Sequence, residues 1–251
     1  MRGAVLVVVG LATEARTVAG PGMRVVAGGG SRSGLEHQLA GIDPRDLRAV
    51  LSFGLAGALH PGLRVGDLLS PDSVVSVNGD PIRVNEALAA ALGRAVAADG
   101  IAARNGGLAG SDVPLLTTDA KAELRGRVSA VAVDMESHIA GRYAEEHDVP
   151  FAAVRVISDP ADRSLPEVAG RAMRPDGSVD LRAVLSGLAR DPRQLPSLIR
   201  TARDAAVAFR QLRRVGGLLR RRAGLVDLGG SLLGLGGGLL GLGGRLLGLE
   251  L

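Results

Sequence analysis

Three carboxylates in this 251-residue chain follow closely on apolar segments, and together they could carry acid–base chemistry. They are Glu14, Glu136 and Asp159. Active sites of α/β proteins collect at the carboxyl ends of the strands, so we expect these side chains to converge. Such a group can divide the work of a reaction, because one acid donates a proton while an ionised neighbour stabilises positive charge or activates a nucleophile.

Each carboxylate also has a simpler explanation. Glu136 and Asp159 could be acids at helix N-termini, where the helix dipole stabilises negative charge. Glu14 could be a surface residue in a first helical turn. The glycine-rich segment 54–57 could be only a tight turn at the end of a strand.

Several common sites are excluded by the sequence. There is no G-x-G-x-x-G segment after the first apolar run, no Walker phosphate loop and no G-x-S-x-G elbow. The four histidines lack metal-ligand spacing, and the absence of cysteine excludes disulfides, thiolate metal sites and cysteine nucleophiles. We therefore expect no metal and no cofactor.

The elements that must position the acids follow from hydrophobic patterning. Continuous apolar runs predict strands buried on both faces, in a sheet covered by helices. The predicted strands cover residues 4–9, 24–27, 48–53, 66–76, 129–134 and 151–157. The predicted helices cover residues 35–40, 85–99 (with Asn85 as N-cap), 118–127, 135–147 and 198–214. The first apolar run resembles a short signal peptide, but its valines and the lack of a cleavage site favour a buried strand.

Charge and glycine are unevenly distributed. The net charge is +4, but the last 51 residues contain eight arginines against three acids, which leaves −1 for the first 200. A neutral body with few aromatic residues argues against nucleic-acid binding. Leucine and glycine dominate 223–251, which we interpret as a low-complexity tail after a catalytic domain at 1–222. A peripheral contact of this basic, apolar end with a membrane is the alternative.

Three segments together resemble the purine nucleoside phosphorylase and nucleosidase superfamily. They are GLATEAR (10–16), SFGLAGALHPGLRVGDLLSPDSV (52–74) and VAVDMESHIAGRYAEEHDVPFAAVRVISDPAD (131–162). The resemblance spans about residues 4–215 and implies a single three-layer α/β/α domain with a mixed central sheet. Residues 173–205 look like the hopanoid-associated branch, which implies removal of adenine from adenosylhopane.

The resemblance also implies roles for individual residues. Asp159 would protonate purine N7, Glu136 would accept hydrogen bonds from the ribose 2′- and 3′-hydroxyls, and Met135 would lie against the ribose. Further substrate contacts are expected at Val113, Leu115, Phe151, Ser158, Gly54, Ala56 and Gly57.

The nucleophile stays open between water and phosphate. Glu14 is the candidate base for water. Phosphate would be a co-substrate held by Gly10, Arg16, Gly30, Ser31 and Arg32. Ser52 and Leu55 stand where many phosphorylases carry phosphate ligands, and the glycine loop before Arg32 could be a mere connector.

The resulting prediction is an enzyme that releases adenine from a 5′-substituted adenosine by phosphorolysis or hydrolysis. The alternatives are a methylthioadenosine/S-adenosylhomocysteine-type nucleosidase, an inactive nucleoside-binding module and a structural protein that uses the tail. We expect a cytoplasmic homo-oligomer, placed peripherally at the inner membrane if the substrate is lipid-linked.

Overall fold

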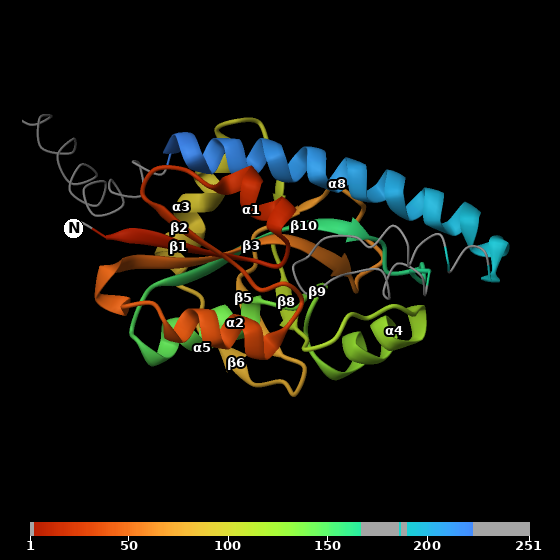
Figure 1. The fold of residues 1–251 in the computed structure, drawn as a ribbon, viewed down its shortest axis with the longest axis horizontal. Helices are drawn as coiled ribbons and strands as arrows, with labels where there is room; N and C mark the ends of the chain where they lie inside the picture. Colours follow the sequence, from red (N-terminus) through yellow and green to blue (C-terminus); the bar gives the residue numbers. More distant parts are fainter. Residues whose placement is uncertain (1–2, 167–185, 187–189, 223–251) are drawn as a thin grey trace, which may run out of the picture.

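A computed structural model describes residues 3–166, 186 and 190–222 of the chain. Helices cover both faces of one ten-stranded sheet (Figure 1). Because the sheet mixes parallel and antiparallel pairs, the predicted α/β/α architecture with a mixed sheet is confirmed. The tail predicted at 223–251 lies outside the described residues, so the division of the chain at residue 222 stays a prediction.

The middle of the sheet consists of four parallel strands in the order β2-β1-β3-β10. Their bounds are β1 (Ala4–Val9), β2 (Met23–Ala27), β3 (Leu47–Ala58) and β10 (Phe151–Asp159). Most residues of β1, β3 and β10 are buried, as expected for strands with helices on both faces. Their carboxyl ends lie at one edge, where the predicted acids also stand.

Shorter strands extend the sheet on both sides. On one side, β9 (Ala132–Asp134) pairs antiparallel with the end of β3, followed by β8 (Gly107–Gly110), β5 (Ser73–Ser76) and β6 (Pro81–Ile82). On the other side, β4 (Leu68–Leu69) pairs with β10 and with β7 (Ala103–Arg104).

The predicted strand 66–76 is wrong as a single element. It divides into β4 and β5, which lie on opposite sides of β3 in the sheet. Pro71 stands between them and cannot donate a ladder hydrogen bond, so the chain leaves one edge and crosses to the other.

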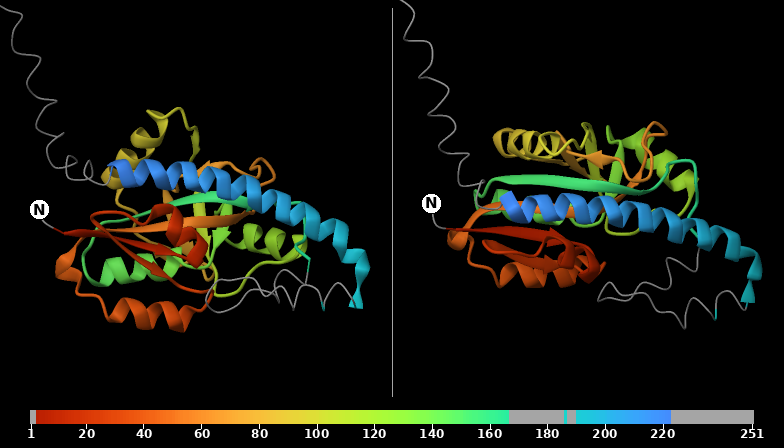
Figure 2. Two further views of the ribbon diagram at one scale, coloured as in Figure 1. Left: turned by 45° about the horizontal axis from the view of Figure 1, so that its top comes forward. Right: turned by 90° about the horizontal axis from the view of Figure 1, so that it is seen from above.

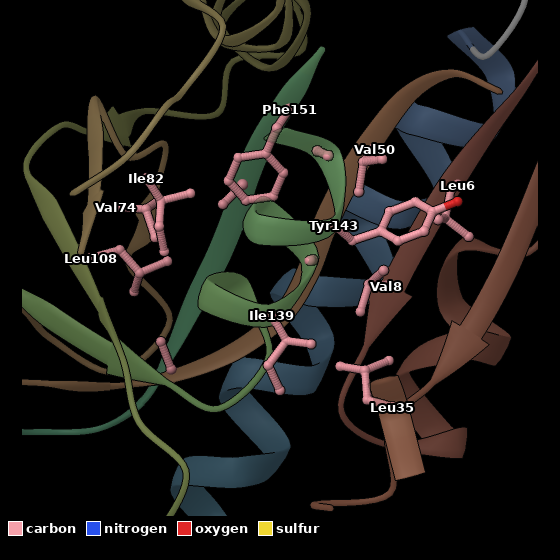
Figure 3. Close-up of a cluster of buried hydrophobic side chains, with 14 of the residues drawn as sticks. Leu6, Val8, Leu35, Val50, Val74, Ile82, Leu108, Ile139, Tyr143 and Phe151 are labelled. Atoms are coloured by element: carbon pink, nitrogen blue, oxygen red, sulfur yellow. The ribbon is translucent and has the colours of Figure 1, made fainter. Parts of the chain in front are cut away.

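Each face of the sheet has its own helices and its own core. On one face lie α1 (Ala12–Val18), α3 (Glu86–Ala97) and α8 (Leu195–Arg222), which runs along the length of the sheet (Figure 2). On the other face lie α2 (Arg32–Ala40) and α5 (Ser137–Glu146), whose apolar side chains pack on the strands (Figure 3). The helix α4 (Thr118–Arg127) packs beside β8 and β9. The described residues also form two 3-10 helices, η1 (Pro44–Asp46) and η2 (Pro192–Gln194).

The predicted helices are present: the one at 118–127 has the predicted bounds, and the others have shifted ends. The side chain of Asn85 accepts a hydrogen bond from the N–H of Leu88 and caps α3 as expected. The helix α1, which is only seven residues long, was not among the predicted helical ranges, although a first helical turn at Glu14 was considered. Within the described ranges, none of the helices is both long and apolar enough to cross a bilayer.

Candidate active site

The first predicted acid, Glu14, lies in the first turn of α1 and is buried. Its carboxylate accepts hydrogen bonds from three backbone N–H groups, those of Gly10 (2.8 Å), Leu11 (2.9 Å) and Leu55 (2.9 Å). Gly10 and Leu11 follow β1, whereas Leu55 belongs to β3. Glu14 therefore links the end of β1 to β3 and is not the surface residue that was the simpler explanation.

A fully buried arginine lies at the centre of the acidic cluster. Arg155 of β10 is 0% exposed, forms an ion pair with Asp134 at the end of β9, and lies 3.6 Å from the carboxylate of Glu136. The hydroxyls of Ser52 and Ser137 complete the network, at 2.5 Å and 3.2 Å from Nη2 of Arg155. Nε and Nη1 of Arg155 have no hydrogen-bond partner among the described residues.

Two glycines let the acids and the arginine approach the strands closely. A Cβ atom at Gly54 would lie 2.5 Å from Nη1 of Arg155 and 2.9 Å from both carboxylate oxygens of Glu14. A Cβ at Gly10 would lie 2.7 Å from Oε1 of Glu136. Gly54 lies inside β3, so the simpler explanation of 54–57 as only a tight turn is wrong: the glycines make room within a strand.

Glu136 precedes α5, but it does not cap that helix with its side chain. Burial raises the pKa of Glu136 from 4.5 to about 8, although the nearby charge of Arg155 acts in the opposite direction. Burial also raises the pKa of Glu14, against the effect of Arg155 and of the three N–H groups. The positive charge of Arg155 is already shared with Asp134, so it does not compensate three buried carboxylates fully.

These shifts predict that the protein is more stable at pH 5.5 than at pH 8.5. Between 4.5 and about 8 the folded state keeps a proton on Glu136 that the unfolded chain has released, so a rise in pH through this window favours unfolding. Glu14 acts in the same direction. We expect Glu136→Gln to show a smaller fall in Tm between the two pH values than the wild type. An equal fall in both proteins would contradict the assignment.

The third acid, Asp159, forms a second polar group at the end of β10. Its pairing partner is Gly57 on β3, where a Cβ would lie 3.1 Å from Oδ2 of Asp159. The register shifts between Ile157 and Asp159, a bulge that sets the direction of the carboxyl group. No described helix begins at Asp159, so the helix-terminus explanation is wrong for this residue.

The partners of Asp159 are a serine and the only lysine of the chain. The hydroxyl of Ser158 lies 2.7 Å from Oδ1 of Asp159 and 3.2 Å from the carbonyl oxygen of Ala56. Lys121 of α4 donates to Oδ2 at 2.5 Å and is 1% exposed. This second polar group lies at Gly57, and the acidic cluster around Arg155 lies at Gly54, three residues earlier. The two polar groups are therefore about 10 Å apart along β3.

Five of the eight predicted substrate-contact residues lie in or beside these two groups. The other three, Val113, Leu115 and Phe151, do not contact them. Met135 stands between Asp134 and Glu136 and is half-buried. Val113 is 64% exposed in the loop after β8, and Leu115 packs against the cluster around α4. Phe151 lies at the opposite end of β10 from Asp159, buried in the core (Figure 3), so the structure does not bring it to the site.

Three of the predicted phosphate-binding residues, Gly30, Ser31 and Arg32, lie at the start of α2. Gly30 has a positive φ of 71°, and Ser31 caps α2 by accepting from the N–H of Gly34. Arg32 already pairs with two carboxylates, those of Glu36 (2.8 Å) and Asp112 (3.0 Å).

Of the two other predicted phosphate-binding residues, Gly10 lies beside the acids and Arg16 does not. The N–H of Gly10 is taken by Glu14. Arg16 is exposed on α1, and within the described part of the chain it has no recorded ion pair.

Arg155 and Lys121 are the site residues that the sequence analysis did not single out. An arginine inside the apolar run 151–157 is a signal by itself, because a charge in a doubly covered strand must be compensated. A single lysine among 29 arginines is a second signal.

Comparison with known proteins places the fold. Residues 29–185 match the family model described as the phosphorylase superfamily. The 5′-methylthioadenosine/S-adenosylhomocysteine nucleosidase of Helicobacter pylori, solved with butyl-thio-DADMe-Immucillin-A, is 17% identical with a TM-score of 0.61, over 86% of this chain and 98% of that one.

Two other solved structures are similar to the same extent. Futalosine hydrolase of Helicobacter pylori strain 26695 is 18% identical with a TM-score of 0.57, over 63% of this chain and 88% of that one. The nucleosidase of Neisseria meningitidis with methylthio-immucillin-A is 18% identical with a TM-score of 0.59, over 76% and 99%. At these identities the likeness shows a shared fold. A search of curated proteins finds no match.

Proposed function

The chain belongs to the phosphorylase superfamily, and on that premise we propose that it hydrolyses the N-glycosidic bond of a 5′-substituted adenosine. The family match confirms the predicted class of enzyme, a nucleoside phosphorylase or nucleosidase. The choice of water over phosphate rests on one observation, the surroundings of Glu14.

Glu14 occupies the backbone donors that a phosphate would need. The N–H groups of Gly10, Leu11 and Leu55 converge on its carboxylate, and Glu136 adds a second acid close by. An anionic nucleophile would have to displace one carboxylate and approach another. A water molecule meets no such repulsion, and a carboxylate whose pKa is raised by burial is a stronger base, suited to deprotonate it.

The sugar and the base fit the two polar groups on β3. Near Gly54, the carboxyl group of Glu136 can hydrogen-bond to the ribose hydroxyls, and in its ionised form it favours the cationic sugar of the transition state. Near Gly57, Asp159 can protonate N7 of the purine, which lets adenine leave as a neutral base. The separation of the groups along the strand is on the scale of one nucleoside.

For the 5′ substituent we propose the hopane of adenosylhopane. The resemblance of 173–205 to the hopanoid-associated branch supports it, although much of that segment lies outside the described residues. In the described part, α8 presents exposed apolar side chains at Leu195, Ile199 and Val207. Membrane contact and a homo-oligomeric state stay predictions. The alternative substrate is methylthioadenosine. Release of adenine from methylthioadenosine, with none from adenosylhopane, would establish that alternative.

Product analysis tests the nucleophile. The purified protein, supplied with a 5′-substituted adenosine in phosphate-free buffer, is expected to release adenine and a free ribosyl product. Added phosphate should leave the rate unchanged and yield no ribosyl 1-phosphate. Release that depends on phosphate would establish phosphorolysis, and no release from any adenosine would favour the inactive binding module.

A further inference from the structure

The proton-donating role of Asp159 raises a question, because the structure places an ammonium group on it. A carboxyl group that protonates a purine must carry the proton itself. In the ion pair between Lys121 and Asp159, with 2.5 Å between Nζ and Oδ2, the exchangeable proton belongs to the lysine. The question is where the proton for the base comes from.

The pair is built into the fold and is not a surface contact. The side chain of Lys121 is 1% exposed and that of Asp159 is 12% exposed. Lysine has three N–H donors, and all are used: one on Asp159, one on the carbonyl of Pro160 at 2.8 Å and one on the carbonyl of Arg163 at 3.1 Å. Burial of a lysine with every donor satisfied is costly to arrange, so a general stabilising role is a weak explanation.

The segment around the pair is fixed from two sides. The N–H of Thr118 at the start of α4 donates to the hydroxyl of Ser164, and the N–H of Leu165 donates to the carbonyl of Leu116. Arg163 pairs with Asp204 of α8. These contacts hold the loop after β10 around Lys121 and keep its ammonium group against Asp159.

We propose that Lys121 is the positioning residue through which Asp159 acts, and that the Lys121–Asp159 pair holds the proton that the leaving base receives. As the C1′–N9 bond breaks, its electrons go to the base. An N–H bond of Lys121 breaks, its proton passes to the carboxylate of Asp159, and Asp159 passes it on to N7, where the new N–H bond forms. Lys121 becomes a neutral amine, and Asp159 remains a carboxylate opposite the cationic sugar. Solvent returns the proton to Lys121 after adenine leaves.

This inference rests on the proposed function, and a comparison of leaving groups tests it separately. An adenine nucleoside needs a proton at N7, whereas 4-nitrophenyl riboside releases a phenolate that needs none. We expect Lys121→Met to lower kcat for the adenine nucleoside by at least about tenfold and to leave KM and nitrophenyl release close to wild type. Lys121→Arg should behave in the same way, because a guanidinium does not give up its proton. Arg125→Met, an exposed position on the same helix, is the matched control and should match wild type on both substrates.

A double-mutant cycle decides the matter if Lys121→Met folds poorly or nitrophenyl riboside is not a substrate. Lys121→Met and Asp159→Asn together remove both charges, and the double variant should be no slower with adenine nucleosides than Asp159→Asn alone. Additive losses, equal losses on both substrates, or wild-type kcat in Lys121→Met or Lys121→Arg would overturn the proposal. A wild-type protein that releases no adenine would refute the proposed function instead.

Discussion

Asp159→Asn is expected to lower kcat for adenine release by about 10²–10⁴-fold, the range for loss of a positioned general acid. The amide has the size of the carboxyl group and therefore fits against Gly57. The space there is narrow, because a Cβ added at Gly57 would lie only 3.1 Å from Oδ2 of Asp159. It can still hydrogen-bond to a purine, but it has no acidic proton to donate. Binding of a slowly reacting analogue, measured by titration calorimetry, should therefore change little.

The matched control for this variant is Asp162→Asn, three residues along the chain on an exposed position. It removes the same charge without touching the end of β10 and should keep the wild-type rate. If Asp159→Asn also turns over at the wild-type rate, Asp159 is not the acid, and the role of Lys121 fails with it. If both variants are slow, the loss reflects the charge of the loop rather than proton transfer.

The sequence predicted a sheet covered by helices and the positions of the three acids after its strands, because each depends on a local pattern. Valine-rich runs such as 4–9 specify strands buried on both faces, and Glu14, Glu136 and Asp159 follow such runs closely. Because the carboxyl ends of parallel strands meet at one edge of a sheet, no knowledge of long-range contacts is needed to place the acids there. For the same reason Asn85 could be assigned to the start of α3 from its residue type alone.

What the sequence did not predict depends on contacts between distant segments. Lys121 and Asp159 are 38 residues apart, and nothing near Lys121 indicates that α4 brings it to the end of β10. The prediction that Phe151 lies near the site is wrong for a related reason. Phe151 and Asp159 belong to the same sequence motif, but they stand at opposite ends of β10, which is nine residues long.

The two glycines of β3 explain why one strand serves both halves of the site. Gly54 leaves space for Arg155 and Glu14, and Gly57 leaves space for Asp159. A glycine weakens a strand, so two of them in a buried central strand indicate that close approach of polar groups outweighs that cost. The polar groups for the sugar and for the base are then held on the same rigid element, which fixes their separation.

Arg155→Met is expected to have the largest effect on stability. Arginine at this position compensates Asp134 directly and Glu136 at 3.6 Å, and it is 0% exposed. Its loss leaves buried carboxylates without a counter-charge, which costs about 3–5 kcal/mol of the free energy of unfolding. For a domain of this size we expect a fall in Tm of about 10 °C, measured by thermal denaturation at pH 7.5.

The control is Arg142→Met, which removes an exposed arginine that pairs with Glu145 at 3.0 Å. An exposed pair of this kind contributes about 0–1 kcal/mol, so Tm should stay within a few degrees of wild type. Asp134→Asn in the Arg155→Met background should recover part of the loss, because it removes the carboxylate that was left uncompensated. A wild-type Tm for Arg155→Met, or a further fall in the double variant, would show that the buried charges do not compensate one another as the geometry indicates.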